Sequence, residues 1–240
     1  VNLYVVIDGV RTSRPYSISS APGVGHLDLT VRRKPGGFVS KYLLKAVKKG
    51  TELESSGPAG RFYHEPLIDG SDLVFLAGGS GITPFASLIR DAIRRERSYS
   101  IHLIYGSRVP DDVIFGKELE RLAKGSSAIR YTPVISDPPE GHEGPTGFLT
   151  AELLRELLGE VEGRTFYLCG PNAMLDLCLG ALAELGVPPW QVRRELYGPP
   201  DDVTAQPRWP EGLAADPAFT VAVEGGPRSE ASARAPAITS

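Results

Sequence analysis

The stretch Leu76-Ala77-Gly78-Gly79-Ser80-Gly81-Ile82-Thr83-Pro84 decides the fold of this chain. It follows an apolar strand predicted at residues 73–77. It leads into a helix that we expect Pro84 to open, because a first helical turn does not need the N–H that proline lacks. Glycines let the backbone approach a phosphate, and a helix N-terminus offers it N–H groups. A tight strand–helix turn also favours glycine, but the strand–glycine–helix context favours a nucleotide site.

Downstream of this stretch, apolar strands alternate with amphipathic helices. The expected strands are residues 101–105, 131–135, 165–169 and 192–197, and the expected helices are residues 84–93, 115–122, 151–158 and 172–185. Such alternation predicts parallel strands in an open α/β sheet. Gly186 stands where a helix C-cap favours glycine.

Upstream, the first 70 residues are β-rich. Residues 1–7 form a dense apolar run, residues 27–33 alternate with Leu27, Leu29 and Val31 on one face, and residues 52–55 suit a short strand. A short helix is expected at residues 39–47, where apolar residues recur at helical spacing.

Three further motifs carry residues suited to ligand binding. In Arg14-Pro15-Tyr16-Ser17 an arginine can hold a phosphate and a tyrosine can stack on a ring, although the motif taken alone favours a partly buried strand. Gly36-Gly37-Phe38-Val39-Ser40 precedes a helix and suits either an anion or an ordinary glycine turn. Cys169-Gly170-Pro171 ends a strand, where open sheets bind ligands, yet Cys169 could also be a small buried hydrophobe.

Composition narrows the class of protein. The 240 residues are 41% hydrophobic and carry a net charge of −3, so nothing favours a nucleic-acid partner. We expect no transmembrane segment, because no apolar run approaches the roughly 20 residues that a span needs, and no signal peptide at Val1. The only two cysteines, Cys169 and Cys178, suit a reducing, cytoplasmic setting and are too few to hold an iron–sulfur cluster.

Taken in order, these motifs resemble the ferredoxin–NADP reductase superfamily. The series is Arg-Pro-Tyr-Ser, Gly-Gly-x-x-Ser, Gly-Pro-x-Gly-x-Phe, Gly-Gly-Ser-Gly-Ile-Thr-Pro, Tyr-Gly-Ser-Arg and Cys-Gly-Pro, between Arg14 and Pro171. The pattern is most similar to NAD(P)H reductase modules that carry a C-terminal plant-type [2Fe–2S] domain, such as oxygenase reductases and the NADH-oxidising component of sodium-translocating NADH:quinone reductase.

The resemblance implies a flavin-binding antiparallel β-barrel followed by a Rossmann-like NAD(P)-binding domain. The implied domains are an N-terminally incomplete FAD-binding part at residues 1–68, an NAD(P)-binding part at residues 69–198, and at residues 199–240 a linker with the start of a ferredoxin-like domain or a disordered tail. The residues expected at the flavin are Arg14, Pro15, Tyr16, Ser17, Val31, Arg33, Gly37, Phe38, Val39 and Ser40. Those expected at the dinucleotide are Gly79, Ser80, Thr83, Ser107, Arg108, Cys169, Gly170 and Pro171.

The activity that the resemblance implies is hydride transfer from NADH or NADPH to FAD, followed by single-electron transfer to an acceptor protein or a missing iron–sulfur domain. Ser17, Thr83 and Cys169 are the residues expected beside the reacting rings. FMN stays open as the flavin, and the sequence does not decide between the two coenzymes. A dinucleotide-binding module without catalysis is an alternative. A generic Rossmann dehydrogenase is disfavoured, because residues 98–102 lack the expected ribose-binding acid.

Overall fold

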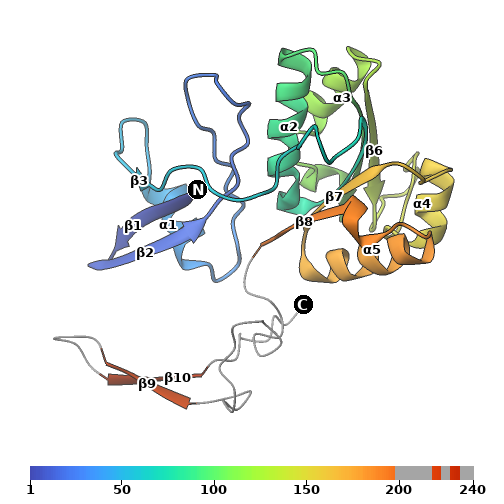
Figure 1. Ribbon diagram of the computed structural model, residues 1–240. Coiled ribbons are helices and arrows are strands. Elements are labelled where there is room, and N and C mark those ends of the chain that lie inside the picture. The colour runs from blue at the N-terminus through green and yellow to red at the C-terminus, as the bar shows by residue number, and fades with distance from the viewer. Residues whose placement is uncertain (198–217, 223–227, 233–240) are drawn as a thin grey trace. The chain divides into compact units, whose positions relative to one another are not determined.

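Two sheets organise the unit Val1–Glu195, and a separate hairpin lies in the unit Leu196–Ser240. The computed structural model describes residues 1–197, 218–222 and 228–232. Figure 1 shows a small antiparallel sheet near the N-terminus and a larger sheet flanked by helices, in the order that the sequence predicts.

The larger sheet has five strands in the order β6-β5-β4-β7-β8. They are β4 (Asp72–Gly78), β5 (Ser100–Ser107), β6 (Ile129–Ile135), β7 (Thr165–Gly170) and β8 (Val192–Leu196). Strand β4 pairs in parallel with both β5 and β7, and β5 pairs in parallel with β6, so the predicted parallel sheet is confirmed. The chain runs outward from β4 in one direction and resumes at β7 in the other. The crevice between the ends of β4 and β7 is therefore a topological switch point, where ligands of such sheets bind.

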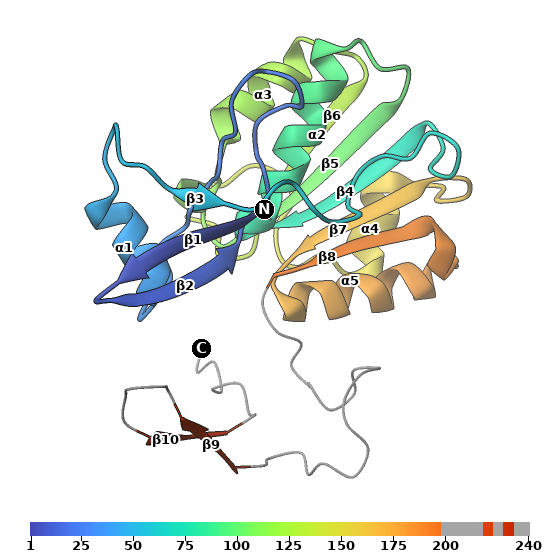
Figure 2. The same cartoon turned by 60° about the vertical axis from the view of Figure 1, so that its left-hand side comes forward.

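Helices cover both faces of this sheet (Figure 2), as the alternation of strands and helices requires. Helix α2 (Ile82–Arg94) packs on one face, where Phe85 stacks on Phe75 of β4 at 4.8 Å between ring centroids. Helices α4 (Ala151–Leu158) and α5 (Asn172–Glu184) contact each other and share the opposite core with Val74 and Leu76. Helix α3 (Gly116–Lys124) packs against β6.

Two helix ends test the sequence predictions. Helix α2 begins at Ile82, after a 3₁₀ turn at Gly79–Gly81, so Pro84 is its third residue and the expectation that Pro84 opens the helix is wrong by two residues. Proline is tolerated there because N–H groups throughout the first turn lack intrahelical partners. At the end of α5, Gly186 has φ +80, donates to Ala183 O and precedes Val187, which donates to Leu182 O. This pair of bonds is a Schellman motif, and the predicted glycine cap is confirmed.

The N-terminal sheet is smaller, with three antiparallel strands in the order β2-β1-β3. They are β1 (Asn2–Ile7), β2 (Val10–Pro15) and β3 (Glu54–Ser55), and helix α1 (Phe38–Ala46) packs against β1. The core between them consists of five buried residues: Leu3, Val5, Ile7, Val39 and Leu43. The sequence predicted β1, β3 and α1 but did not predict β2, whose residues are mostly polar or charged.

The strand expected at residues 27–33 is wrong. The structure has only an isolated bridge there, between Ile18 and Leu29, and Leu27 is 56% exposed. The backbone bonds of this segment go to a neighbouring loop: Ser19 N donates to Asp28 O, and Asp28 N donates to Ser20 Oγ. Local hydrogen bonds to serine hydroxyls therefore replace a strand ladder.

In the second unit, β9 (Ala218–Ala222) pairs antiparallel with β10 (Arg228–Ser232). The sequence predicts a strand at residues 219–224 followed by a hairpin turn, and the antiparallel pair of β9 and β10 agrees with that hairpin. The expected turn at Gly225-Gly226 and the expected linker lie outside the described residues. Among the described helices, none combines the length and apolarity needed to cross a membrane.

Candidate functional site

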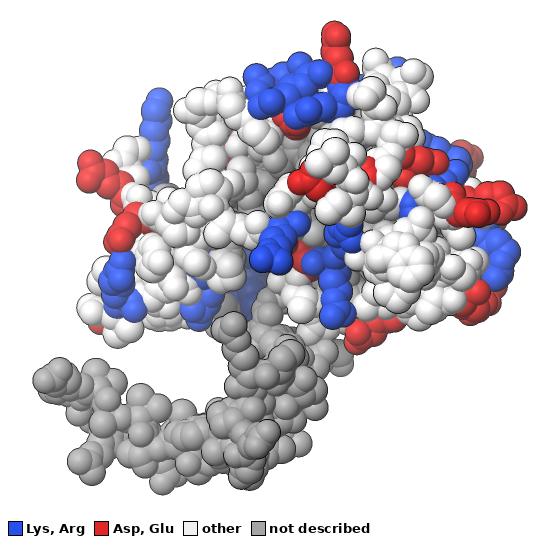
Figure 3. Space-filling view, in the orientation of Figure 1, with Lys and Arg blue, Asp and Glu red and all other residues white. Residues whose placement is uncertain are grey.

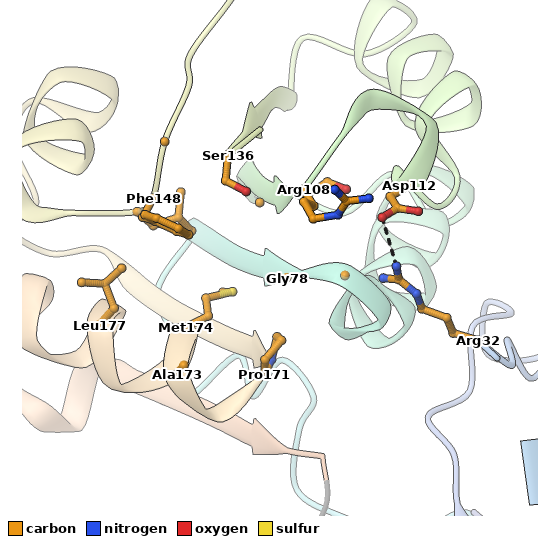
Figure 4. A pocket seen from close by; sticks show the side chains of 15 residues that line it. Arg32, Gly78, Arg108, Asp112, Ser136, Phe148, Pro171, Ala173, Met174 and Leu177 are labelled. Atoms are coloured by element: carbon orange, nitrogen blue, oxygen red, sulfur yellow. Dashed lines mark ion pairs between the residues drawn. The ribbon is translucent and has the colours of Figure 1, made fainter. Parts of the chain in front are cut away.

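A cavity of about 630 Å³ opens at the carboxyl ends of β4, β5, β6 and β7 (Figure 4). We call it the sheet-end cavity. Four predicted site residues line it: Gly79, Ser107, Arg108 and Pro171. Its other walls come from Arg32, Asp112, Ser136, from the loop at Gly147–Leu149 and from the start of α5 at Ala173–Leu177. A single cavity thus gathers residues from Arg32 to Leu177.

Close backbone approach explains the glycines at the switch point. A Cβ added to Gly81 would lie 2.1 Å from Cys169 O, and one added to Gly78 would lie 2.2 Å from the Met174 sulfur. Gly170 is equally restricted, with its added Cβ 2.8 Å from the same sulfur. The close approach of Gly81 to β7 therefore requires glycine, because its added Cβ meets fixed backbone, whereas the closest contacts of Gly78 and Gly170 are with the movable Met174 side chain.

Helix N-termini give the site a positive potential. Neither α2 nor α5 has a side-chain cap or an acidic residue in its first turn. By contrast α4, which follows the lining loop Gly147–Leu149, is capped by Thr150 and carries Glu152 in its first turn. Uncapped helix N-termini without acidic residues favour a bound anion such as a pyrophosphate.

Two arginines at the cavity are each paired with an aspartate. Arg32 lies 3.2 Å from Asp112, as the dashed line in Figure 4 marks, and Arg108 lies 3.1 Å from Asp137. Arg32 reaches the cavity from the N-terminal part of the chain, and its guanidinium lies against Gly79. The sequence prediction named its neighbours Val31 and Arg33 and missed Arg32.

Tyr105, on β5, holds the turn at Gly79 through hydrogen bonds of its hydroxyl. Its buried hydroxyl donates to Gly79 O at 2.8 Å and accepts from Ile114 N at 3.2 Å. Burial raises the pKa of Tyr105 to about 12, so the hydroxyl stays protonated and remains a donor at physiological pH. Beyond the Tyr-Gly-Ser-Arg motif, no local pattern of residues points to this role.

A second cavity of about 330 Å³ lies where the N-terminal part meets α2, and we call it the interface cavity. Tyr16 and Ser17 line it on one side, and Pro84, Ser87 and Leu88 of α2 line it on the other. Pro84 directly follows Thr83. The two motifs predicted to hold the two reacting rings therefore share one cavity.

Glu195 of β8 also lines the interface cavity and was missed by the sequence prediction. Burial raises the pKa of its carboxyl, which favours the protonated form. Burial likewise raises the pKa of Tyr16. A single glutamate in a short strand carries no recognisable signal, because only the tertiary structure places it in the same cavity as Ser17.

The start of α1 offers a cradle suited to a pyrophosphate. A Cβ on Gly37 would lie 2.6 Å from Ser40 Oγ and 2.9 Å from Lys34 O, so a side chain there would force the turn to shift. No side chain caps this helix, and its first turn holds no acidic residue. Phe38, Val39 and Ser40 present the N–H groups of that turn, while the Val39 side chain is buried in the core. A flavin dinucleotide fits these residues.

The remaining predicted residues lie around these three places. Arg14 and Pro15 are on β2, where the Arg14 guanidinium donates to Ser13 O at 2.7 Å. Thr83, whose hydroxyl donates to Ser80 O, and fully buried Cys169 lie behind the cavity walls and are not among the lining residues. Gly170 joins Cys169 at the end of β7, Val31 packs against the N-terminal core, and Arg33 is exposed.

Known proteins share both parts of this arrangement. Residues 1–64 match the oxidoreductase FAD-binding domain family, and residues 75–179 match the oxidoreductase NAD-binding domain family. Ferredoxin–NADP reductase B of Sorangium cellulosum is 37% identical over 204 residues, covering 82% of this chain and 83% of that protein.

Solved structures agree. The cytochrome P450 reductase GcoB of Amycolatopsis has a TM-score of 0.73 at 29% identity, covering 82% of this chain and 60% of that one. A ferredoxin NADP⁺ reductase of Neisseria gonorrhoeae with bound FAD and NADP has a TM-score of 0.66 at 26% identity, covering 81% and 83%. Together with the two cavities and the glycine cradle, these matches place the chain in the ferredoxin–NADP reductase superfamily, as an NAD(P)H-dependent flavoprotein oxidoreductase with FAD-binding and NAD-binding domains.

Proposed function

We propose that this chain takes hydride from NAD(P)H in the sheet-end cavity, delivers it to FAD at the interface cavity, and passes electrons singly to a protein acceptor. One observation carries the proposal: the start of α2 adjoins both cavities. Gly79, three residues before the helix, lines the sheet-end cavity, and Pro84 lines the interface cavity beside Tyr16 and Ser17. Two rings bound on either side of this turn would be held close enough to react.

The chain's residues bind and orient in this scheme. The start of α1 and Arg14 hold the flavin phosphates, Tyr16 packs against the flavin ring, and Ser17 donates beside it. Val31 and Arg33 edge that ring. The uncapped starts of α2 and α5 receive the dinucleotide phosphates, and Cys169-Gly170-Pro171 borders the nicotinamide. Bound FAD supplies the ability to accept two electrons together and release them one at a time.

Proton handling falls to the interface cavity. Glu195 is half-buried in the cavity lining and burial raises the pKa of its carboxyl, so we assign it the exchange of a proton with the cavity. Ser17 lines the same cavity. No metal or nucleophile is required, because the redox chemistry belongs to the two nucleotide groups.

We also propose a cytoplasmic setting, which the two cysteines of the sequence suit. In this scheme the acceptor is a one-electron carrier protein. Support comes from relatives whose names specify different protein acceptors: a ferredoxin for the Sorangium protein and a cytochrome P450 for the Amycolatopsis protein. A shared donor half combined with different acceptors fits a module that delivers single electrons.

An anaerobic absorption spectrum tests the proposal. The purified chain, reconstituted with FAD, should show flavin absorbance that bleaches on addition of NADH or NADPH and returns when a one-electron acceptor such as ferricyanide is added. Bound FAD that neither coenzyme bleaches would contradict the proposal and favour a dinucleotide-binding module without catalysis.

A further inference from the structure

One polar stripe of α2 holds a loop of the N-terminal part. Ser87 Oγ donates to Ser20 O at 2.7 Å, Arg90 donates to Ser19 O, and Arg94 donates to Pro22 O. Positions 87, 90 and 94 are three and four residues apart, so they share one face of the helix. Figure 3 shows basic side chains gathered over one end of α2. Three consecutive donors on the helix thus bind three carbonyls of residues 19–22.

The loop they hold connects two predicted flavin contacts. It begins after Tyr16 and Ser17 and ends before Val31. Hydrogen bonds join its two arms: Ser19 Oγ donates to Asp28 O, Thr30 Oγ1 donates to Ser19 Oγ, and Ser20 Oγ donates to His26 O. Moving residues 19–22 would therefore move Ser17, because the loop transmits displacement instead of absorbing it.

Gly23 leaves room for the Arg94 side chain, one of the three donors of α2 that together we call the α2 clamp: Ser87, Arg90 and Arg94. Its φ is +75, and a Cβ added there would lie 3.1 Å from an Arg94 guanidinium nitrogen. A side chain at this position would strain the backbone and displace that guanidinium. The turn after Pro22 is thus shaped to receive Arg94.

Arg90 is the best-supported member of the stripe. Glu118 of α3 accepts from it through both carboxylate oxygens, at 2.8 and 2.7 Å. The Phe115 ring lies 4.7 Å from the guanidinium carbon, and Phe115 adopts φ +62, a conformation unusual for a non-glycine residue. Only 22% of the Arg90 side chain is exposed. Glu118 and Phe115 therefore fix the position of the guanidinium independently of its bond to Ser19.

We propose that Arg90, assisted by Ser87 and Arg94, is a positioning residue that sets the alignment of Tyr16 and Ser17 against the start of α2. The inference rests on the proposed function. Residues 83 and 90 lie on one rigid helix, about 10 Å apart at 1.5 Å rise per residue. The helix that borders the nicotinamide thus also fixes the wall that carries the flavin contacts. A misplacement of about 1 Å between reacting groups can slow a transfer about 100-fold.

The test compares Arg90→Gln and Ser87→Ala with Arg97→Gln, a control that removes an arginine which pairs with Asp91 and does not contact the loop. We expect Arg90→Gln to lower the limiting rate of flavin reduction at saturating coenzyme about tenfold, with coenzyme affinity changed less than about twofold. Ser87→Ala should have a smaller effect in the same direction. Arg90→Lys, which retains one donor, should recover part of the rate, and Arg97→Gln should match the parent protein.

Hydrogen–deuterium exchange gives a readout that does not depend on turnover. In apoprotein, Arg90→Gln should speed exchange across residues 18–30 and leave β4 and β7 unchanged, whereas Arg97→Gln should leave both unchanged. If Arg90→Gln exchanges as the parent does, or reduces its flavin at the parent rate, the positioning role is overturned. A purely structural role is indicated if flavin content and melting temperature fall while the remaining holoprotein keeps the parent rate. Failure of the proposed function is separate, because it would appear in the parent protein as flavin that neither coenzyme reduces.

Discussion

The two sheets of the unit Val1–Glu195 build their binding places in different ways. The five-stranded sheet forms its cavity from strand ends and helix N-termini above a continuous core, in which Leu76, Ile104 and Leu168 have no exposed surface. The three-stranded sheet has a core of five buried residues, and its predicted flavin contacts lie on strand β2, on loops and at the start of one helix.

This difference shows where each region obtains its rigidity. The cavity of the larger sheet is supported by that sheet's own core. The smaller part is held in addition by hydrogen bonds from α2, donated by Ser87, Arg90 and Arg94. Small cores contribute little stability by themselves. We therefore expect damage to the large core to abolish folding of both regions, and damage to the small part to reduce flavin binding first.

The largest expected difference between the two regions is in the cost of truncating a leucine in each core. Leu76→Ala removes a fully buried side chain on β4 and should lower the free energy of unfolding by about 4 kcal/mol, while Leu3→Ala, at 5% exposure on β1, should cost about 2 kcal/mol. Urea unfolding followed by circular dichroism measures both. Leu3→Ala should also lose flavin at urea concentrations that leave coenzyme binding intact. Equal costs and simultaneous loss of both ligands would show that the two cores unfold as one.

Alanine at two glycines compares the two cradles. Gly81→Ala drives a methyl group into the Cys169 carbonyl, which belongs to a buried strand, and should cost about 3 kcal/mol and abolish coenzyme binding. Gly37→Ala meets Ser40 Oγ and Lys34 O in an exposed turn that can relax, and should cost about 1 kcal/mol while weakening FAD binding. Unfolding curves and calorimetric titrations with each ligand measure the effects. Both glycines have φ values open to alanine, so a stabilised Gly81→Ala protein would refute the steric argument.

The larger sheet should also respond to acid through His102. Burial, with Arg130 and Arg164 nearby, lowers the pKa of His102 to about 4 from an ordinary 6.5. The unfolded chain therefore binds the extra proton first, and stability should fall as pH drops from 6.5 towards 4, by on the order of 1–2 kcal/mol after allowing for partial solvation. His102→Gln, which can keep the bond to Thr132, should flatten this slope in urea unfolding measured across that range. An unchanged slope would assign the acid sensitivity to other groups.

The smallest expected effect concerns coenzyme choice in the sheet-end cavity. Asp137 neutralises Arg108 through a pair in which both side chains are about two-thirds exposed (66% and 68%), so the pair adds less than about 1 kcal/mol of stability. Asp137→Asn should release Arg108 towards a 2′-phosphate and improve NADPH affinity about threefold to tenfold while leaving NADH affinity unchanged. Titrations with both coenzymes measure the ratio, with Glu184→Gln, which also removes one negative charge from a distant exposed pair, as the control. A parallel change for NADH would mean that Asp137 acts on the cavity as a whole.

Sequence patterns predicted the larger sheet well because its signals are local and repeated. Each buried strand is a short apolar run, and the glycines at positions 78, 79 and 81 mark a turn in which Gly81 leaves no room for a side chain. The expected bounds there differ from the structure by at most two residues. The smaller sheet was predicted less well. Strand β2 is polar, and residues 27–33 alternate like a strand but bond to serine hydroxyls instead.

The candidate site divides in the same way. Tyr16, Ser17 and Gly79, which line the cavities, were identifiable because each belongs to a continuous motif. The sequence did not identify the roles of Arg32, Glu195 and Arg90. Each of these residues meets its partner in the site, by contact or in a shared cavity, at least 47 positions away in the sequence.

The sequence by itself determined the order of strands and helices around the larger sheet, the glycine turns and the motifs predicted to contact two nucleotides, since these depend on neighbours a few positions apart. Only the tertiary structure decided which of those motifs share a cavity, which arginines are paired and which helix holds the N-terminal loop. The physical reason is that burial, ion pairing and steric contact depend on distances in space, which the spacing of residues along a chain does not record.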